Sequence, residues 1–243
     1  MRDYGPAEMM AVVLARQIRD GEVVFVGVNS PLPAVAALLA RRLHAPRCTL
    51  VSIAGGINPT PSRLTASTTT TALAEGSASI FDNADFYDLV ARGGVDVTFL
   101  GAAQVDVEGS LNTTVIGPRE RPKVRLPGGG GAAFILPLAQ RTIVWRAAHS
   151  RRIFVERCDF ATARGRLERV VTPLCVFRLA QGRLALESVH PYATVEQVVA
   201  NTGFGLETNG ARITPAPTAD ELAMLERVDP EGVRRSEFRP GEA

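Results

Sequence analysis

Four consecutive glycines are the residues with the clearest chemical use in this sequence. They are Gly128, Gly129, Gly130 and Gly131, and they follow Pro127. Because glycine has no side chain, backbone N–H groups in such a run can close around an anion, either a phosphate or the oxyanion of an acyl-transfer intermediate. The run is not a P-loop or a dinucleotide fingerprint, since no GK[ST] follows it and no strand directly precedes it. From the spacing alone, an anion site and a flexible loop are equally well supported.

A second candidate group lies after the apolar segment 95–100. Gln104, Asp106 and Asn112 follow that segment closely. Polar groups at a strand end can orient a carbonyl or a carboxylate. The alternative is a hairpin turn over 106–109, with Asn112 satisfying backbone groups. The sequence leaves both interpretations open.

Other catalytic chemistries have less support. His44, His149 and His190 have no carboxylate or cysteine nearby at metal-ligand spacing, so we expect structural roles for them and no metal site. No GxSxG or SxxK pattern supports a serine hydrolase. The three cysteines are far apart and odd in number, which argues against a disulfide framework and favours a reducing, cytoplasmic location.

Composition and charge exclude several classes of protein. The chain has 243 residues, of which 46% are hydrophobic and 21% charged, as in an ordinary globular protein. A net charge of +2 predicts neither nucleic-acid nor membrane binding, and no apolar run approaches the ~20 residues that span a bilayer. Between residues 141 and 169, eight arginines accompany only three acids. That stretch is either a phosphate-docking face or a solvated or subunit-contact surface.

The apolar pattern alternates between strand and helix periods. It predicts helices over 6–18, 33–44 and 84–91 and strands over 22–28, 50–53, 95–100 and 142–146. A hairpin follows around Gln181–Gly182, and helices open after Thr194 and Thr218. We therefore predict an α/β fold, an open and mostly parallel sheet with helices on both faces, with a C-terminal hairpin and helices, as a single domain over residues 1–243.

Ligands bind such sheets outside the carboxyl ends of the strands. This rule makes the segment after the strand 50–53 a candidate pocket wall. Gly55 and Asn58 of that segment, and Ile53 at the end of the strand itself, join Gln104 and Asn112 as pocket candidates.

Several longer segments resemble the β subunits of family I CoA-transferases, especially the glutaconate CoA-transferase type. They are residues 96–117 (DVTFLGAAQVDVEGSLNTTVIG), 121–133 (RPKVRLPGGGGAA), 151–160 (RRIFVERCDF), 171–177 (VTPLCVF) and 188–204 (SVHPYATVEQVVANTGF). The segment 217–239 is similar to the C-terminus of the β subunit of a related hydrolase, which opens the last steroid rings as CoA thioesters. The resemblance covers nearly the whole chain.

The resemblance implies the CoA-transferase fold and a homologous α subunit, usually in an α2β2 heterotetramer with the active site between the subunits. It also implies a coenzyme A thioester as substrate and no bound cofactor. Members of the family attack the thioester with a glutamate in a pattern like L-V-[YF]-E-x-G. The matching segment here is Leu50–Gly55, with Ile53 in place of the glutamate and Gly129 in place of a usual serine of the glycine loop.

An isoleucine cannot form an acyl intermediate, so covalent transfer through this position is excluded if the alignment holds. We therefore expect a β subunit acting on an acyl-CoA, with no catalytic residue of its own identified and with the glycine loop binding the oxyanion. One alternative is a hydrolase that cleaves a C–C bond in a cyclic keto-acyl-CoA, with an acid supplied by the α subunit. Others are a non-catalytic structural subunit and, more distantly, a sugar-phosphate isomerase.

Overall fold

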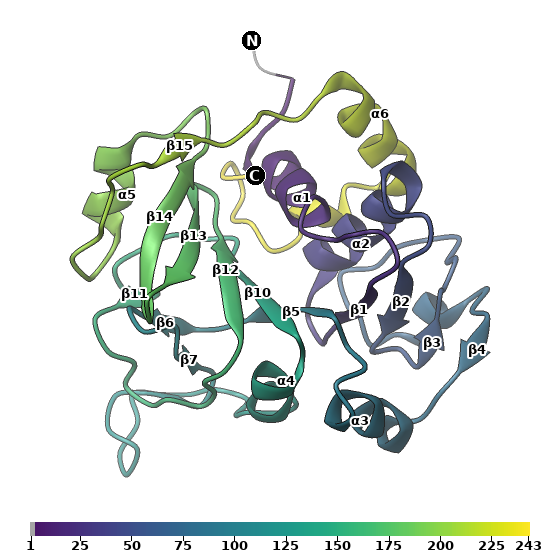
Figure 1. Ribbon diagram of the computed structural model, residues 1–243, viewed down its shortest axis with the longest axis horizontal. Helices are drawn as coiled ribbons and strands as arrows, with labels where there is room; N and C mark the ends of the chain where they lie inside the picture. The colour runs from purple at the N-terminus through teal and green to yellow at the C-terminus, as the bar shows by residue number, and fades with distance from the viewer. Residues whose placement is uncertain (1–2) are drawn as a thin grey trace. The chain divides into compact units, whose positions relative to one another are not determined.

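The computed structural model describes residues 3–243, and these residues form two compact units. Unit 1 is formed by the chain up to Leu100 together with Ala216–Ala243. Unit 2 is the continuous segment Gly101–Pro215. Each unit has its own layers of strands and helices, shown in Figure 1.

The sheet of unit 1 is parallel at its centre. Its strand order is β5-β1-β2-β3-β4, with β5 at Val97–Gly101, β1 at Val23–Val26, β2 at Thr49–Ser52, β3 at Gly56–Ile57 and β4 at Ser79–Ile80. Strands β5, β1 and β2 run parallel, whereas β3 and β4 add as antiparallel strands. Phe25 of β1 lies level with Val51 and Thr98. The central strands are almost wholly buried, as expected of parallel strands covered on both faces.

Helices cover both faces of this sheet, as predicted. Helix α2 spans Pro31–Leu43 and helix α3 spans Asn83–Ala91. Phe86 of α3 stacks on Phe25 at 4.1 Å between ring centroids, whereas Ala34 and Ala37 of α2 share a small cavity with Val26. Because neighbouring residues of a strand point to opposite faces, the two helices lie on opposite sides of β1 (Figure 1).

Helix α1, Pro6–Ala15, differs from the amphipathic helix that its spacing predicts. Every residue from Ala7 to Ala15 is buried. The helix contacts α2, α6 (Ala219–Val228) and the 3-10 turn η2 (Val233–Arg235), so it has no solvent face. Its one charged residue, Glu8, accepts a hydrogen bond from Arg234 Nε at 2.8 Å. A helix that is apolar nearly all round is stable only when it is covered in this way.

The larger sheet of unit 2 contains the predicted hairpin. Their order is β15-β14-β13-β12-β10, with β10 at Arg141–Trp145, β12 at Leu167–Val171, β13 at Cys175–Ala180, β14 at Arg183–Val189 and β15 at Arg212–Ile213. Gln181 and Gly182 join β13 to β14 with φ values of 51° and 77°, as a tight hairpin turn requires. Strand β12 lies parallel to β10 and antiparallel to β13, so the sheet is mixed.

Shorter strands and helices complete unit 2. A three-stranded sheet has the order β11-β6-β7, with β11 at Phe154–Val155, β6 at Gln104–Asp106 and β7 at Leu111–Asn112. A hairpin pairs β8, Val115–Ile116, with β9, Val124–Arg125. Helix α4 spans Ala132–Leu138 and α5 spans Val195–Asn201, the latter capped by Thr194 as predicted. The 3-10 turn η1, Thr71–Ala74, belongs to unit 1.

Among the described residues, no helix is both long enough and apolar enough to cross a bilayer. Cys48, Cys158 and Cys175 are all buried and free of disulfide bonds.

Candidate functional site

The glycine loop lies between strand β9 and helix α4 and has the backbone of an anion-binding turn. Gly128 and Gly130 have positive φ values of 95° and 47°, whereas Gly129 and Gly131 do not. Alternation of this kind turns successive N–H groups toward one side. The N–H groups of Gly129, Gly130 and Gly131 donate to no acceptor in residues 3–243, and a Cβ built on Gly130 would meet open space. The loop therefore presents three free donors to an accessible space.

Threonine side chains hold the first residue of this loop in place. The Gly128 N–H donates to the Thr113 carbonyl oxygen at 2.8 Å, and Thr113 Oγ1 donates back to the Gly128 carbonyl oxygen at 2.8 Å. Thr162 Oγ1 in turn accepts the Thr113 N–H at 2.9 Å and bonds Thr114 Oγ1 at 2.7 Å. A fixed loop loses little entropy when an anion binds, so these contacts favour binding.

The structure brings Gln104 and Asn112 together just before the segment that leads from Thr113 to the glycine loop. They face each other across the β6–β7 hairpin, and Asn112 Nδ2 donates to Gln104 Oε1 at 2.7 Å. Gln104 Oε1 also accepts the Asp159 N–H at 3.1 Å. Asn112 uses its other amide atoms within the chain, since Nδ2 also donates to the Val115 carbonyl and Oδ1 accepts from Thr114 N–H at 2.9 Å. Both residues are buried and support the turn that leads to Thr113.

Asp106 has the role that the hairpin interpretation gives it. Its carboxylate accepts the N–H groups of Glu108, Ser110 and Cys158. The hairpin and the clustered polar residues are therefore the same feature, because Gln104 and Asn112 pair across it.

The remaining pocket candidates lie in unit 1, on the turn from β2 to β3. Ile53 follows β2 directly, is half-buried, and donates its N–H to the Val26 carbonyl at 3.2 Å. Gly55 has a φ of 91°, and a Cβ there would lie 3.2 Å from the Phe81 carbonyl oxygen. Asn58 exchanges two hydrogen bonds with Leu50, each of 2.8 Å. Ile53 thus lies at a strand end and outside the buried core.

The half-buried His149, the buried His190 and the buried cysteines are poor nucleophiles. Burial lowers the pKa of both His149 and His190 to about 4, so both rings are neutral at pH 7. Their ring nitrogens bond Thr172, Thr202 and Thr214, as structural histidines do. Burial also raises the pKa of Cys158 and Cys175 to about 12, so neither thiol is a thiolate at neutral pH. Within residues 3–243, no group of His, Cys, Asp or Glu could hold a metal ion.

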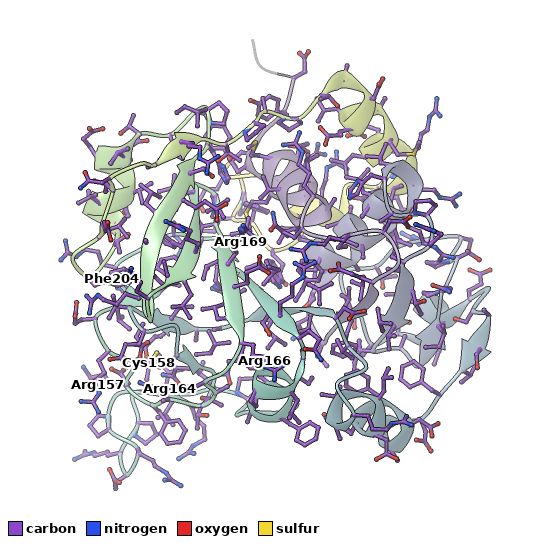
Figure 2. All side chains as sticks on the ribbon, in the orientation of Figure 1. Arg157, Cys158, Arg164, Arg166, Arg169 and Phe204 are labelled. Atoms are coloured by element: carbon purple, nitrogen blue, oxygen red, sulfur yellow. The ribbon has the colours of Figure 1, made fainter. Side chains whose placement is uncertain are left out.

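The arginines between residues 141 and 169 do not form one free phosphate face. Arg141 and Arg169 both pair with Glu168, Arg169 also pairs with Glu187, and Arg164 pairs with Glu108. Figure 2 shows Arg169 well separated from Arg157 and Arg164. Arg141, Arg164 and Arg169 are therefore engaged in ion pairs within the chain.

Two contributors to the loop were missed by the sequence analysis. Thr162 and the Asp159 backbone lie 49 and 55 residues from their partners Thr113 and Gln104. A pairing over that distance leaves no periodic signal, and a lone threonine in the segment 160–166 has no distinguishing neighbour.

The site and fold have clear relatives. A model of the coenzyme A transferase family matches residues 7–201. The B subunit of 3-oxoadipate CoA-transferase from Pseudomonas knackmussii is 36% identical over 94% of this chain and 95% of its own length. Glutaconate CoA-transferase from Acidaminococcus fermentans is 28% identical with a TM-score of 0.84, covering 99% of this chain and 97% of its own.

A decarboxylase, AibA/AibB, is also similar. It is 34% identical with a TM-score of 0.93, covering 99% of this chain and 100% of its own. The CoA-transferase fold expected from the sequence is thereby confirmed. The family model matches most of this chain, and the subunit-B relatives match nearly all of it. This chain therefore belongs to the coenzyme A transferase family.

Proposed function

We propose that this chain is the β subunit of a heteromeric enzyme that acts on an acyl-CoA thioester. The observation that carries the proposal is the glycine loop, whose three free N–H groups can receive the oxyanion that forms when a thioester carbonyl is attacked or enolised. The relatives named as B subunits support pairing with a homologous α subunit, which we propose forms an α2β2 heterotetramer. We also propose that residues 1–243 act as one family domain in that assembly and that the complex is cytoplasmic.

The alignment of Ile53 with the family's glutamate defines what this chain supplies. An aliphatic side chain can neither attack the thioester nor accept a proton. At this position it can only line the pocket and exclude water. The chain's own part is then to bind and polarise the carbonyl, with Gln104 and Asn112 supporting the loop. We propose that the catalytic base or acid comes from the partner subunit. No bound cofactor is needed for this role.

Two reactions fit a site without the glutamate. Hydrolysis, including C–C cleavage of a cyclic keto-acyl-CoA, needs a water activated by the partner. Decarboxylation is favoured by the 34% identical decarboxylase, because loss of CO2 from a carboxylated acyl-CoA needs no nucleophile and leaves an enolate oxygen that the loop can hold. A structural subunit has no use for three adjacent backbone donors left without an acceptor, so we rank that alternative lower.

The test is product analysis by mass spectrometry. The complex purified with its partner is given a panel of acyl-CoAs in oxygen-18 water, with and without acetate or succinate. Heavy oxygen in the acid product indicates hydrolysis, and loss of CO2 with the thioester intact indicates decarboxylation. CoA transferred to an added acceptor indicates a substitute nucleophile and overturns the role given to Ile53. No turnover of any acyl-CoA would overturn the enzymatic proposal in favour of a structural subunit.

A further inference from the structure

A cavity of about 700 Å³ lies within unit 1, between the C-terminal ends of helices α2 and α6 and the segment 59–64. Its volume falls in the range of small-molecule sites, roughly 300 to 1,000 Å³. Four arginines line it: Arg41 and Arg42 from the last turn of α2, Arg63 from the loop, and Arg227 from the last turn of α6. Four guanidinium groups therefore surround one cavity.

The acids of the same lining pair with only one of these arginines. Glu231 accepts a hydrogen bond from Arg63 at 2.9 Å. The other three arginines have no ion pair with Glu231. Asp229 is buried and its carboxylate is used by Arg234 at 3.1 Å and by the N–H groups of Val233 and Arg234. The guanidinium groups of Arg41, Arg42 and Arg227 donate to no side chain or carbonyl in residues 3–243.

The rest of the lining suits a ligand that is partly apolar. Leu38, Leu64, Met224 and Val228 contribute aliphatic surface. Four prolines on the wall limit backbone motion, so the shape is largely formed before a ligand arrives. Guanidinium groups bind phosphates through paired hydrogen bonds, and a flat base can pack on aliphatic side chains. The combination matches a nucleotide better than an inorganic anion.

Helix polarity accounts for part of this pattern. Basic residues in the last turn of a helix are ordinary, since they complement the negative end of the helix dipole. That preference explains Arg41, Arg42 and Arg227 one by one. It does not explain why two helix ends converge on one cavity together with Arg63, which lies on a loop. Like charges brought together repel one another, and a bound anion relieves that repulsion.

We propose that this arginine-lined cavity binds a nucleoside diphosphate group. The group could belong to a free nucleotide or to the nucleotide end of coenzyme A, which share the same chemistry. The proposal does not depend on which reaction the enzyme performs.

The experiment is calorimetric titration of ADP, coenzyme A and adenosine into the full-length chain, purified with the subunit that accompanies it, at low salt. We expect ADP to bind and adenosine to bind at least tenfold more weakly. Arg42→Gln and Arg227→Gln should each weaken ADP about tenfold, the loss expected for one charge-assisted hydrogen bond. Arg92→Gln, an exposed arginine at the end of α3, is the matched control and should leave ADP affinity unchanged.

Coenzyme A distinguishes the two sources. If the two variants weaken coenzyme A as much as ADP, the nucleotide end of coenzyme A occupies the cavity. If the variants weaken the binding of ADP but not of coenzyme A, the ligand is a free nucleotide. The proposal is overturned if ADP shows no binding at millimolar concentration, or if it binds with the same affinity to wild type and to both variants. Circular dichroism of each variant verifies the fold, and both substituted arginines are exposed, so their loss leaves no buried charge unpaired.

Discussion

At the scale of single residues, the chemistry depends on backbone donors more than on side chains. Gly130 is the residue whose conformation matters most, since its φ of 47° turns the neighbouring N–H groups and its Cα faces open space. Asparagine and aspartate tolerate this region of φ and have nearly the same shape. They differ in charge, and a charge near the loop changes its electrostatic interaction with an oxyanion.

We therefore expect Gly130→Asp to lower kcat about 10- to 100-fold relative to Gly130→Asn, because a carboxylate beside the loop repels the developing oxyanion. The measurement is steady-state kinetics of the complex on its best acyl-CoA. Gly210 is the matched control, with a φ of 80° and open space around it in the same unit. Equal rates for the Asp and Asn variants of Gly130 would argue against an oxyanion role.

Ile53→Glu tests the alignment with the family's glutamate. If this turn is the nucleophile position, the variant complex should form a glutamyl-CoA thioester, seen as a mass increase of the intact chain after exposure to acyl-CoA. Half-burial of Ile53 allows a carboxylate to reach solvent without unfolding the turn. Ile80→Glu, on the exposed strand β4, should show no such adduct. A folded Ile53→Glu complex without the adduct would contradict the alignment.

At the scale of elements, close backbone contacts join the pieces of unit 2. Gly203 follows helix α5 and donates its N–H to the Phe154 carbonyl of β11 at 2.8 Å. A Cβ at this position would lie 2.4 Å from that carbonyl oxygen. The contact holds α5 against the β11-β6-β7 sheet, which carries Gln104 and Asn112.

Gly203→Ala should therefore lower the free energy of unfolding by about 1–3 kcal/mol, since the backbone must shift to admit the methyl group. Urea denaturation of the purified chain gives the value. Gly205→Ala is the control, because a Cβ there meets nothing within 4 Å. Equal stability of the two variants would show that α5 moves freely away from β11.

The elements with a strong apolar period were predictable, and those held by distant partners were not. The core strands β1, β2 and β5, the helices α2 and α3 and the β13–β14 hairpin lie within a few residues of their predicted bounds. Strand β12 was missed because Glu168 and Arg169 interrupt its apolar run, and their ion pairs across the sheet are invisible in sequence. The two-residue strands β3 and β4 are too short to leave a period.

The candidate site was predictable to a similar degree. Four glycines in a row left an anion site and a flexible loop equally open, and the structure adds that the N–H groups of Gly129, Gly130 and Gly131 have no acceptor in residues 3–243. The anion-binding role of the loop stays a prediction. The support from Thr162 depends on folding across 49 residues and could not be read from spacing. The roles given to Ile53, Gly55 and Asn58 stay predictions.

At the scale of the whole molecule, two buried clusters govern stability. One contains His149 and His190, whose folded pKa values of about 4 lie below the ordinary 6.5. The unfolded chain therefore binds more protons below pH 6.5, and the free energy of unfolding falls as the pH falls from about 6.5 toward 4. Above pH 6.5 both states hold neutral rings, and these two groups add no pH dependence.

Over pH 5 to 6, we expect each ring to contribute a slope of about 1.4 kcal/mol per pH unit. Urea unfolding at a series of pH values measures the slope. His190→Gln should remove about half of it, whereas His44→Gln, at an exposed position, should leave it unchanged. A flat profile between pH 5 and 7 would contradict the buried, neutral histidines.

The second cluster joins the C-terminal segment to α1. Arg234 is fully buried and pairs with Glu8, Glu226 and Asp229. Burial raises the pKa of Glu8, but hydrogen bonds from Arg234 and the Gly5 N–H outweigh it and hold the pKa below its ordinary value. Both Glu8 and Asp229 are themselves buried, and Arg234 is the buried cation that they share, while Glu8 also pairs with the half-exposed Arg235.

Arg234→Met should lower the free energy of unfolding at pH 7 by about 3–5 kcal/mol, because the buried carboxylates of Glu8 and Asp229 lose the buried cation that they share. Chemical denaturation measures the loss. Arg239→Met, an exposed arginine near the same end, should change stability by less than about 0.5 kcal/mol. A loss as small for Arg234→Met as for the control would show that the cluster opens to water at little cost.

Unit 1 is discontinuous, since Ala216–Ala243 completes it after the whole of unit 2 has intervened. Domains tend to fold as units while the chain emerges from the ribosome. Unit 2 is contiguous and is fully translated before unit 1 is complete, whereas Glu8 of α1 lacks its partner until Arg234 is made. The nascent chain therefore carries an incomplete N-terminal core for most of its synthesis, and we expect it to depend on chaperones during that interval.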